Sequence, residues 1–350
     1  MNSFRIAVYP GDGIGPEVLD QALRVLDRVQ ELDGTFRLET TRLPWGADYY
    51  FQYGAPVPDD YLPTLSPFDA ILLGALGDPR RVPDHISLAP LVQTRQRFDQ
   101  YACVRPVRLF DGVRSLLANA KSIDMIVLRE NSEGEYLPVG GRVRPGEPDD
   151  VGIQTAVHTR RGIERILRFG FELARSRRKR LTMITKSNAL PYGFVLWEEV
   201  LERVRSDYPD VETDRQHADA AAMNFVRRPE FFDVVVSSNL FGDILSDLGG
   251  AIVGGLGLLP SANLNPERTF PSMFEPVHGS APDIVGQGIA NPVAAILSAA
   301  MMLEWLDLKA AATAIRDAIA ATLAAGQVTP DLGGPLTTAQ VTDRILGRMQ

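Results

Sequence analysis

The sequence has a single cysteine, Cys103, so the chain forms no disulfide of its own, which fits a reducing compartment. Its longest apolar run, 292–303, is shorter than the roughly 20 residues that cross a membrane. No basic and apolar leader precedes the first expected strand, 4–9. The formal net charge of −8 argues against general nucleic-acid binding. We therefore expect a soluble cytoplasmic protein with neither a membrane nor a nucleic-acid partner.

Strand-like and helix-like segments alternate along the chain. Short β-branched or apolar runs predict strands, and longer runs with a helical apolar period predict helices. The expected strands are 4–9, 68–75, 123–129, 181–185 and 233–238. The expected helices are 16–30, 160–174, 193–205 and 243–252, followed by a mostly helical segment at 291–325. This alternation predicts an α/β protein with a largely parallel sheet.

The stretch 239–247 is the strongest indication of chemistry in the sequence. Asp243 and Asp247 are four residues apart in a segment whose pattern turns helical after Gly242, so both carboxylates share one helix face. Two like charges on one face repel each other, and a divalent cation between them removes the repulsion. Carboxylate oxygens are ligands that suit Mg²⁺ or Mn²⁺. The sequence therefore predicts a metal site directly after the strand 233–238.

Two glycine-containing loops are candidates for cofactor binding. Residues 11–16 follow a strand and open a helix, but Pro16 stands where a dinucleotide fingerprint has its third glycine, so a tight turn and a ligand-facing loop are equally open. The Gly, Ser and Pro residues of 275–283 bring backbone N–H groups close to a phosphate or ribose. Asp283 can accept both hydroxyls of an unphosphorylated ribose. A structured turn, with His278 satisfying local carbonyls, is the alternative.

Five further side chains are candidates for substrate contact or proton transfer. Arg95, Arg105 and Arg129 stand in or beside apolar segments, where a guanidinium needs a carboxylate from the protein or from a dicarboxylic substrate. Lys186 ends an expected strand, at the sheet edge where α/β proteins bind ligands, and is a candidate base. Tyr136 is a candidate proton donor. The ordinary alternatives are a surface lysine and a packing tyrosine.

Taken together, these residues resemble the metal-dependent β-decarboxylating dehydrogenases, the family of isocitrate, isopropylmalate, homoisocitrate, tartrate and D-malate dehydrogenases. The similarity extends from 11–17 to 332–334, which is nearly the whole chain, and 239–247 and 278–283 are its most specific signatures. Within the family, the chain looks most like the tartrate and D-malate branch. The segments that carry this likeness are 84–88, 98–101, 129–136 and 260–268.

The resemblance implies a fold that is not the Rossmann fold. It implies an isopropylmalate-dehydrogenase-like α/β fold, in which two α/β domains share a central mixed sheet and the active site lies in the cleft between them. Residues 1–100 and 254–350 would form a large domain with most of the NAD contacts, and 101–253 a small domain with the metal and base residues. The family is dimeric, so 138–152 would be a dimer arm.

The resemblance also implies roles for single residues. Lys186 and Asp219 match the base and the aspartate that reach the site from the neighbouring subunit of a homodimer. With Asp243 and Asp247, Asp219 would complete a site for Mg²⁺ or Mn²⁺, and Tyr136 matches the proton donor. A requirement for K⁺ stays open.

The expected cofactor is NAD, because family members that use NADP carry basic or phosphate-binding residues where this chain has Asp283 and Ile284. The expected NAD contacts are Glu275, His278, Gly279, Ser280, Ala281, Asp283 and Asn291.

The expected reaction is NAD- and metal-dependent oxidative decarboxylation of a 2-hydroxy dicarboxylic acid. Arg95, Arg105 and Arg129 would hold the substrate carboxylates. At the positions where isocitrate enzymes present a serine and an asparagine, this chain has Ala89 and Leu91, which argues against isocitrate.

D-malate, which would yield pyruvate and CO₂, and tartrate are the expected substrates. Isopropylmalate enzymes also have leucines near position 91, so 3-isopropylmalate or another 3-alkylmalate, for example in secondary metabolism, is the alternative. A non-catalytic regulatory subunit is disfavoured, because such subunits usually lose metal or base residues and this chain retains them.

Overall fold

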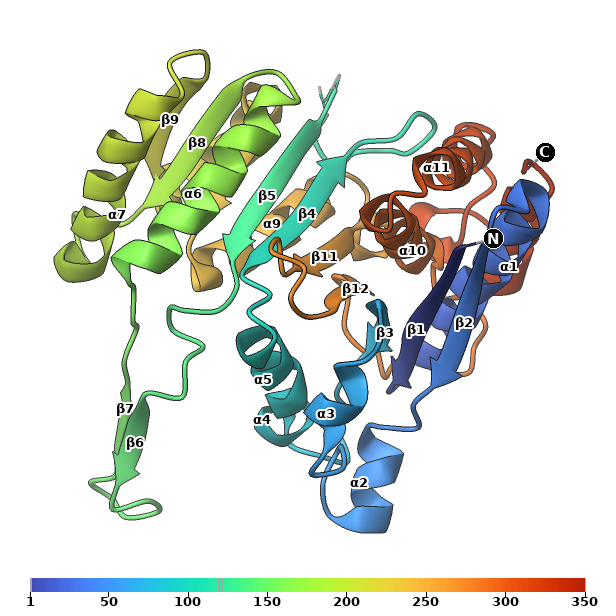
Figure 1. Cartoon of the computed structure of the whole chain (residues 1–350), viewed down its shortest axis with the longest axis horizontal. Helices are drawn as coiled ribbons and strands as arrows, with labels where there is room; N and C mark the ends of the chain where they lie inside the picture. Colours follow the sequence, from blue (N-terminus) through green and yellow to red (C-terminus); the bar gives the residue numbers. More distant parts are fainter. Residues whose placement is uncertain (1, 119, 121, 350) are drawn as a thin grey trace.

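In the computed structural model, which describes residues 2–118, 120 and 122–349, a ten-stranded mixed sheet runs through the whole molecule (Figure 1). The strand order is β2-β1-β3-β12-β11-β4-β5-β10-β8-β9. The strands are β1 (Asn2–Gly11), β2 (Phe36–Arg42), β3 (Ala70–Ala75), β4 (Ala102–Arg108), β5 (Asp124–Glu130), β8 (Arg180–Thr185), β9 (Glu212–His217), β10 (Val234–Ser237), β11 (Pro260–Leu264) and β12 (Ser272–Pro276). A separate hairpin consists of β6 (Gly140–Val143) and β7 (Val151–Gln154).

The helices lie on both faces of the sheet and at its lower edge (Figure 1). They are α1 (Gly15–Asp33), α2 (Ala47–Tyr53), α3 (Tyr61–Leu65), α4 (Asp84–Ser87), α5 (Ala89–Arg97), α6 (Arg160–Arg175), α7 (Pro191–Val204), α8 (Ala218–Arg227), α9 (Asn239–Ile252), α10 (Val293–Trp305), α11 (Lys309–Ala324) and α12 (Thr338–Leu346). Among the described helices, none combines the length and the apolar character that a membrane span needs.

The sheet divides naturally between β11 and β4. Strands from 2–75 and 260–276 form one half, and strands from 102–237 form the other. β11 runs antiparallel to both of its neighbours, β12 and β4, and β4 runs antiparallel to β5, whereas the remaining ladders are parallel. The sheet is therefore mixed, as the resemblance implied, and less uniformly parallel than the alternation of segments alone predicted. The expected domain boundaries follow this division but stay a prediction.

Two helices cover opposite faces of β5, and this fixes where the site lies. Leu128 belongs to the apolar cluster that includes Ile166 of α6, whereas Val127 belongs to the cluster that includes Leu245 of α9. Successive side chains of a strand project from opposite faces. The face of β4 and β5 that α9 covers is the face towards which the candidate active-site residues point.

Helix α9 begins earlier than the sequence predicted. The expected start was residue 243, after a glycine that looked like a break, but the helix begins at Asn239 with Ser238 in an extended N-cap conformation. Serine is favoured at this position because its hydroxyl can accept a hydrogen bond from the first turn, although Ser238 forms no such bond here. Gly242 therefore lies inside the helix, where its lack of a side chain serves packing against β5.

The β6–β7 hairpin projects from the body of the molecule (Figure 1). It overlaps the segment 138–152, which was expected to be a dimer arm, and extends two residues beyond it. The hairpin and its flanks carry four exposed apolar side chains. These are Val139, Val143, Val151 and Ile153. An isolated two-stranded hairpin is at best marginally stable in water, so these side chains need a further surface to pack on.

Candidate active site

Three side chains converge on the carboxylate of Asp243. Arg105 of β4 donates to Asp243 Oδ1 with an Nη1–Oδ1 distance of 2.9 Å, and Arg129 of β5 pairs with the same oxygen. The Tyr136 hydroxyl donates to Oδ2 at 2.7 Å. Arg105 also donates to Ser246, one turn further along α9, at 2.7 Å. Three of the side chains expected to form the site are thus gathered around the carboxylate of a fourth, Asp243.

The local sequence explains how two buried arginines reach this point. Arg105 and Arg129 are 4% and 1% exposed, and both lie on the sheet face covered by α9. A Cβ atom at Gly242 would lie 2.7 Å from the Cβ of Arg129, so only glycine allows this close approach of helix and strand. The Arg129 Nε donates to the side-chain oxygen of Asn239 at 2.8 Å, which holds the guanidinium against the first turn of α9.

The charges around Asp243 set two proton affinities. Burial disfavours its carboxylate, but the guanidinium groups of Arg129 and Arg105 outweigh this effect and lower the pKa of Asp243 to about 2. Burial and the hydrogen bond to Asp243 raise the pKa of Tyr136 to about 12. The aspartate is therefore ionised and the tyrosine protonated at neutral pH, which leaves Tyr136 as a proton donor.

The three carboxylates expected to bind the metal are not all gathered in one chain. Asp247 lies one turn after Asp243 on α9. The residue as a whole is exposed, but partial burial of its carboxyl group and the charge of Asp243 raise its pKa, although Arg105 lowers it. Asp219, at the start of α8, instead pairs with Lys186 at 2.8 Å. Within the described part of the chain, no group of three His, Cys, Asp or Glu side chains is arranged to hold a metal ion.

Arg95 and Glu275, expected to contact substrate and NAD respectively, pair with each other. Their side chains are buried, with an Nη2–Oε1 distance of 2.5 Å. Asn263 of β11 donates to the same Glu275 oxygen at 2.7 Å, and Asn131 donates to Asn263 at 2.9 Å. Arg95 thus has the protein partner that the sequence left open as an alternative. The two asparagines lie in segments that carry the family likeness, 129–136 and 260–268, but were not assigned a role from the sequence.

The two candidate cofactor loops are in direct contact. The Ile14 N–H donates to the Ser280 carbonyl at 2.9 Å, and a Cβ at Gly13 would lie 2.1 Å from that oxygen. His278 Nδ1 is 2.9 Å from the Gly279 carbonyl, in the local turn that the sequence left open as an alternative. His278 Nε2 is buried, and no hydrogen-bond partner for it exists among the described residues.

The remaining expected contacts lie at the edges of these loops. Asn291 donates to Asp331 at 3.0 Å, and Asp331 was not among the expected residues. Asp283 is exposed. Ala281 has a φ of 41°, in the left-handed region. Leu91 is partly buried on α5, where it packs against a cluster of apolar side chains.

The loop that carries Tyr136 is organised by a buried carboxylate, Glu130. It accepts hydrogen bonds from the backbone N–H of Ser132 at 3.1 Å and of Glu133 at 2.7 Å, and Arg165 of α6 lies 4.0 Å away. Burial raises the pKa of Glu130 to about 7, although the hydrogen bonds from Ser132 and Glu133 lower it. Glu130 was not among the expected residues.

Comparison with known proteins identifies the family. The profile of the family described as isocitrate/isopropylmalate dehydrogenase matches residues 5–345. This chain belongs to that family. It is therefore a decarboxylating dehydrogenase, an oxidoreductase acting on a CH–OH group, and the expected fold class is confirmed.

The relatives cover the chain almost completely. It is 53% identical to the D-malate dehydrogenase [decarboxylating] of Escherichia coli, over 99% of this chain and 98% of the relative. It is 50% identical to the tartrate dehydrogenase/decarboxylase of Pseudomonas putida, over 97% of this chain and 96% of the relative. The isocitrate dehydrogenase structure from Methylococcus capsulatus has a TM-score of 0.89 at 36% identity, covering 100% of this chain and 99% of that one.

We expect Glu130→Gln to change how stability depends on pH. The folded pKa of Glu130, about 7, lies above its ordinary value of 4.5, so the folded state binds the proton more tightly than the unfolded state. Wild-type stability should therefore fall by about 3 kcal/mol from this group between about pH 5 and pH 8. The glutamine variant should lack this component in denaturant unfolding measured across that range. Glu31→Gln, on the surface of α1, is the control, and identical pH profiles for Glu130→Gln and wild type would contradict the assignment.

Proposed function

We propose that this protein catalyses the NAD-dependent and divalent-metal-dependent oxidative decarboxylation of D-malate or tartrate. The convergence of Arg105, Arg129 and Tyr136 on Asp243 is the observation that carries the proposal. It places two guanidinium groups, a proton donor and a metal-type carboxylate within hydrogen-bond reach of one another. The names of the D-malate and tartrate relatives, at 46–53% identity, support the same substrate class.

Arg105 and Arg129 bind and orient the substrate. Both are buried, and each needs an anionic partner, because an unpaired guanidinium in such surroundings is strongly destabilising. In this structure Asp243 is that partner. A dicarboxylate bound beside Asp243 offers the guanidinium groups two further carboxylates, whose geometry favours bidentate contact. The pair therefore selects a small diacid over a monoacid.

Asp243 and Asp247 would hold the cation together with Asp219 of the neighbouring subunit. The donor set fits Mg²⁺ or Mn²⁺, because all three ligands are hard carboxylates and Asp247 forms no hydrogen bond or ion pair with any described residue. When bound, the cation supplies Lewis-acid polarisation of the substrate's hydroxyl and carboxylate. A requirement for K⁺ is left for measurement.

Two side chains move the protons. Lys186, supplied by the neighbouring subunit, would take the proton from the oxygen of the 2-hydroxyl. When bound, NAD would supply the acceptor for the hydride of the carbon that bears this hydroxyl. After CO₂ has left, Tyr136 donates its proton to the carbon that carried it, a role that suits a phenol held protonated beside Asp243. The cofactor would lie along Glu275, His278, Gly279, Ser280, Ala281, Asp283 and Asn291. The buried, unpartnered Nε2 of His278 supports a ligand at this loop.

The working unit in this proposal is a homodimer. Lys186 and Asp219 pair with each other and make no contact with Asp243 in their own chain. The exposed apolar side chains of the β6–β7 hairpin provide a surface for a second subunit. We propose that this hairpin joins the subunits so that each supplies Lys186 and Asp219 to the other. A cytoplasmic location, expected from the single cysteine, belongs to the same proposal.

A substrate panel tests the reaction. With NAD and Mn²⁺, D-malate or a tartrate isomer should give NADH and CO₂ in equal amounts. Isocitrate should be turned over at least about tenfold less efficiently, because Ala89 and Leu91 offer no polar group to its third carboxylate. Isopropylmalate is included as the alternative substrate. NADH absorbance and CO₂ release are followed together. Preferred turnover of isopropylmalate would favour the 3-alkylmalate alternative, and NADH without CO₂ would exclude decarboxylation.

Asp247→Asn should abolish turnover while leaving the fold intact. The amide keeps the shape of the side chain but removes a charge from the cation site, so the affinity for Mn²⁺ should fall by about tenfold or more. Calorimetric titration with Mn²⁺ measures binding independently of activity, and circular dichroism checks the fold. Asp317→Asn, an exposed aspartate on α11, is the matched control. Wild-type activity in Asp247→Asn would overturn the proposed site.

Mixing two inactive variants should restore activity if the site is shared between subunits. Lys186→Ala lacks the base, and Asp247→Asn lacks a ligand, but a mixed dimer has one site with both residues intact. Random exchange of equal amounts should recover about a quarter of the wild-type activity. The activity is measured before and after reversible dissociation of the mixture. No recovery, with mixed dimers shown by differential tagging, would mean that Lys186 and Asp247 act within one chain.

A further inference from the structure

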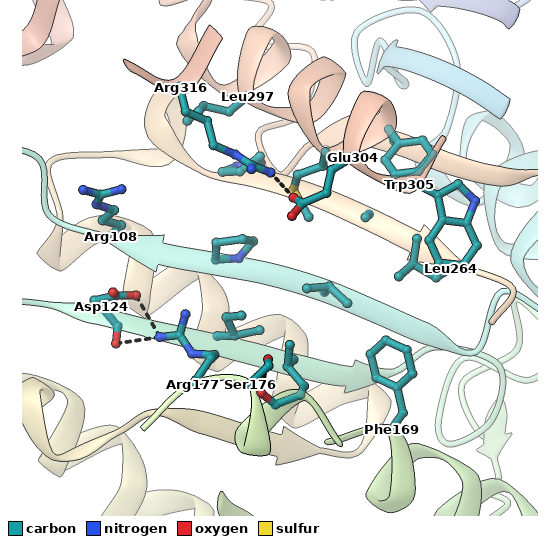
Figure 2. Close-up of a pocket in the computed structure, with 18 of the residues that line it drawn as sticks. Arg108, Asp124, Phe169, Ser176, Arg177, Leu264, Leu297, Glu304, Trp305 and Arg316 are labelled. Atoms are coloured by element: carbon teal, nitrogen blue, oxygen red, sulfur yellow. Dashed lines mark hydrogen bonds and ion pairs between the residues drawn. The ribbon is translucent and has the colours of Figure 1, made fainter. Parts of the chain in front are cut away.

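A cavity of about 550 Å³ lies on the face of the sheet opposite the candidate active site (Figure 2). Alternate residues of three strands form its floor. These are Val104, Pro106, Ile126, Pro260 and Ala262. Arg105, which points to Asp243, is flanked on β4 by two of them. Because successive side chains of a strand project from opposite faces, the cavity and the candidate active site lie back to back on the same strands.

The walls of the cavity come from both halves of the molecule. α6 contributes one wall, including Leu173, and α10 contributes the facing wall, including Leu297. The two ends differ in character. Phe169, Leu264 and Trp305 gather at one end, whereas Arg108 lies at the other (Figure 2). The end with Arg108 also holds Asp124, its neighbour across the β4–β5 ladder, but Asp124 pairs with Arg177, so this end keeps a net positive charge.

Arg108 carries the charge that is not neutralised within the lining. Three of the four arginines that line the cavity have carboxylate partners: Arg177 pairs with Asp124, Arg316 with Glu304 and Arg268 with Asp307. Among the residues that the structure describes, no carboxylate forms an ion pair with Arg108. Its guanidinium lies over the ring of Phe110, 5.2 Å from the centroid, which leaves its donors available to a ligand.

We propose that this cavity is a binding site for a small molecule with one apolar chain and a terminal carboxylate. The carboxylate pairs with Arg108, and the chain lies over the apolar strand floor towards Trp305. The volume is within the range of small-molecule sites, which are mostly apolar with a few placed polar groups. The negative carboxylate matches the end of the cavity that holds Arg108, and the apolar chain matches the end that holds Trp305. The site takes no residue from the cluster around Asp243.

Decanoate is the probe, and 1-decanol is its uncharged counterpart. Calorimetric titration of the full-length protein should show saturable binding of one decanoate per chain, accompanied by a change in tryptophan fluorescence. Arg108→Gln should weaken decanoate binding by about fivefold, because it removes the charged partner but keeps a polar side chain. Decanol should bind wild type and Arg108→Gln equally. Arg37→Gln, which removes an exposed arginine on β2, is the matched control and should bind decanoate as wild type does.

A second variant tests the place of binding by filling the cavity. Leu173 is only partly buried on α6, so Leu173→Trp adds volume to the cavity without displacing a core side chain, and it should abolish binding of both probes. Decanoate binding that is unchanged in Arg108→Gln or retained in Leu173→Trp would overturn the proposal. Absent binding to wild type would also overturn it. If either variant instead alters the sedimentation mass, the cavity is a contact between chains and the proposal fails.

Discussion

The ion pairs of Arg105 and Arg129 with Asp243 are the constraint on which the rest of this arrangement depends. Two guanidinium groups buried in adjacent strands cannot remain unpaired, because a buried charge without a partner costs several kcal/mol. Helix α9 must therefore dock where its first turn presents Asp243 between them. Gly242 permits the close approach, and the loop after β5 completes it by bringing Tyr136 to the second oxygen. One carboxylate thus positions two strands, a helix and a loop.

The sequence predicted the parts of this arrangement that have a local pattern. The apolar stripe of α1, the buried runs of β5 and β10 and the spacing of Asp243 and Asp247 all follow from periodicity. The strands β2 and β9 were missed because they lie at the two edges of the sheet, where polar side chains face solvent and the alternation is weak. β4 and β11 were missed because arginines, asparagine and proline interrupt their apolar pattern. One of these interruptions, Arg105, belongs to the candidate site.

Contacts between distant residues were beyond the reach of local pattern. Arg95 and Glu275 are 180 positions apart. Arg95 was assigned to the substrate because a guanidinium needs an anionic partner, and Glu275 was assigned to NAD from the family resemblance. The fold brings the two together and satisfies both charges. Glu130 was overlooked for the opposite reason: in the sequence it is one of several glutamates, and only the fold distinguishes it as the buried one. Residue type indicates the need for a partner, and tertiary structure decides which partner meets it.

The distribution of charge over the site supports the proposed sharing of residues between two subunits. Asp243 is neutralised by the arginines of its own chain, and Asp219 by Lys186, so each half of the proposed machinery is stable on its own. Asp247 has no such partner among the described residues, and its pKa is raised, first by burial and further by the charge of Asp243. A cation and a neighbouring subunit that brings Lys186 and Asp219 would relieve the repulsion at the point where a diacid is to be bound. In the proposed dimer, assembly, metal affinity and substrate charge would therefore be linked in one site.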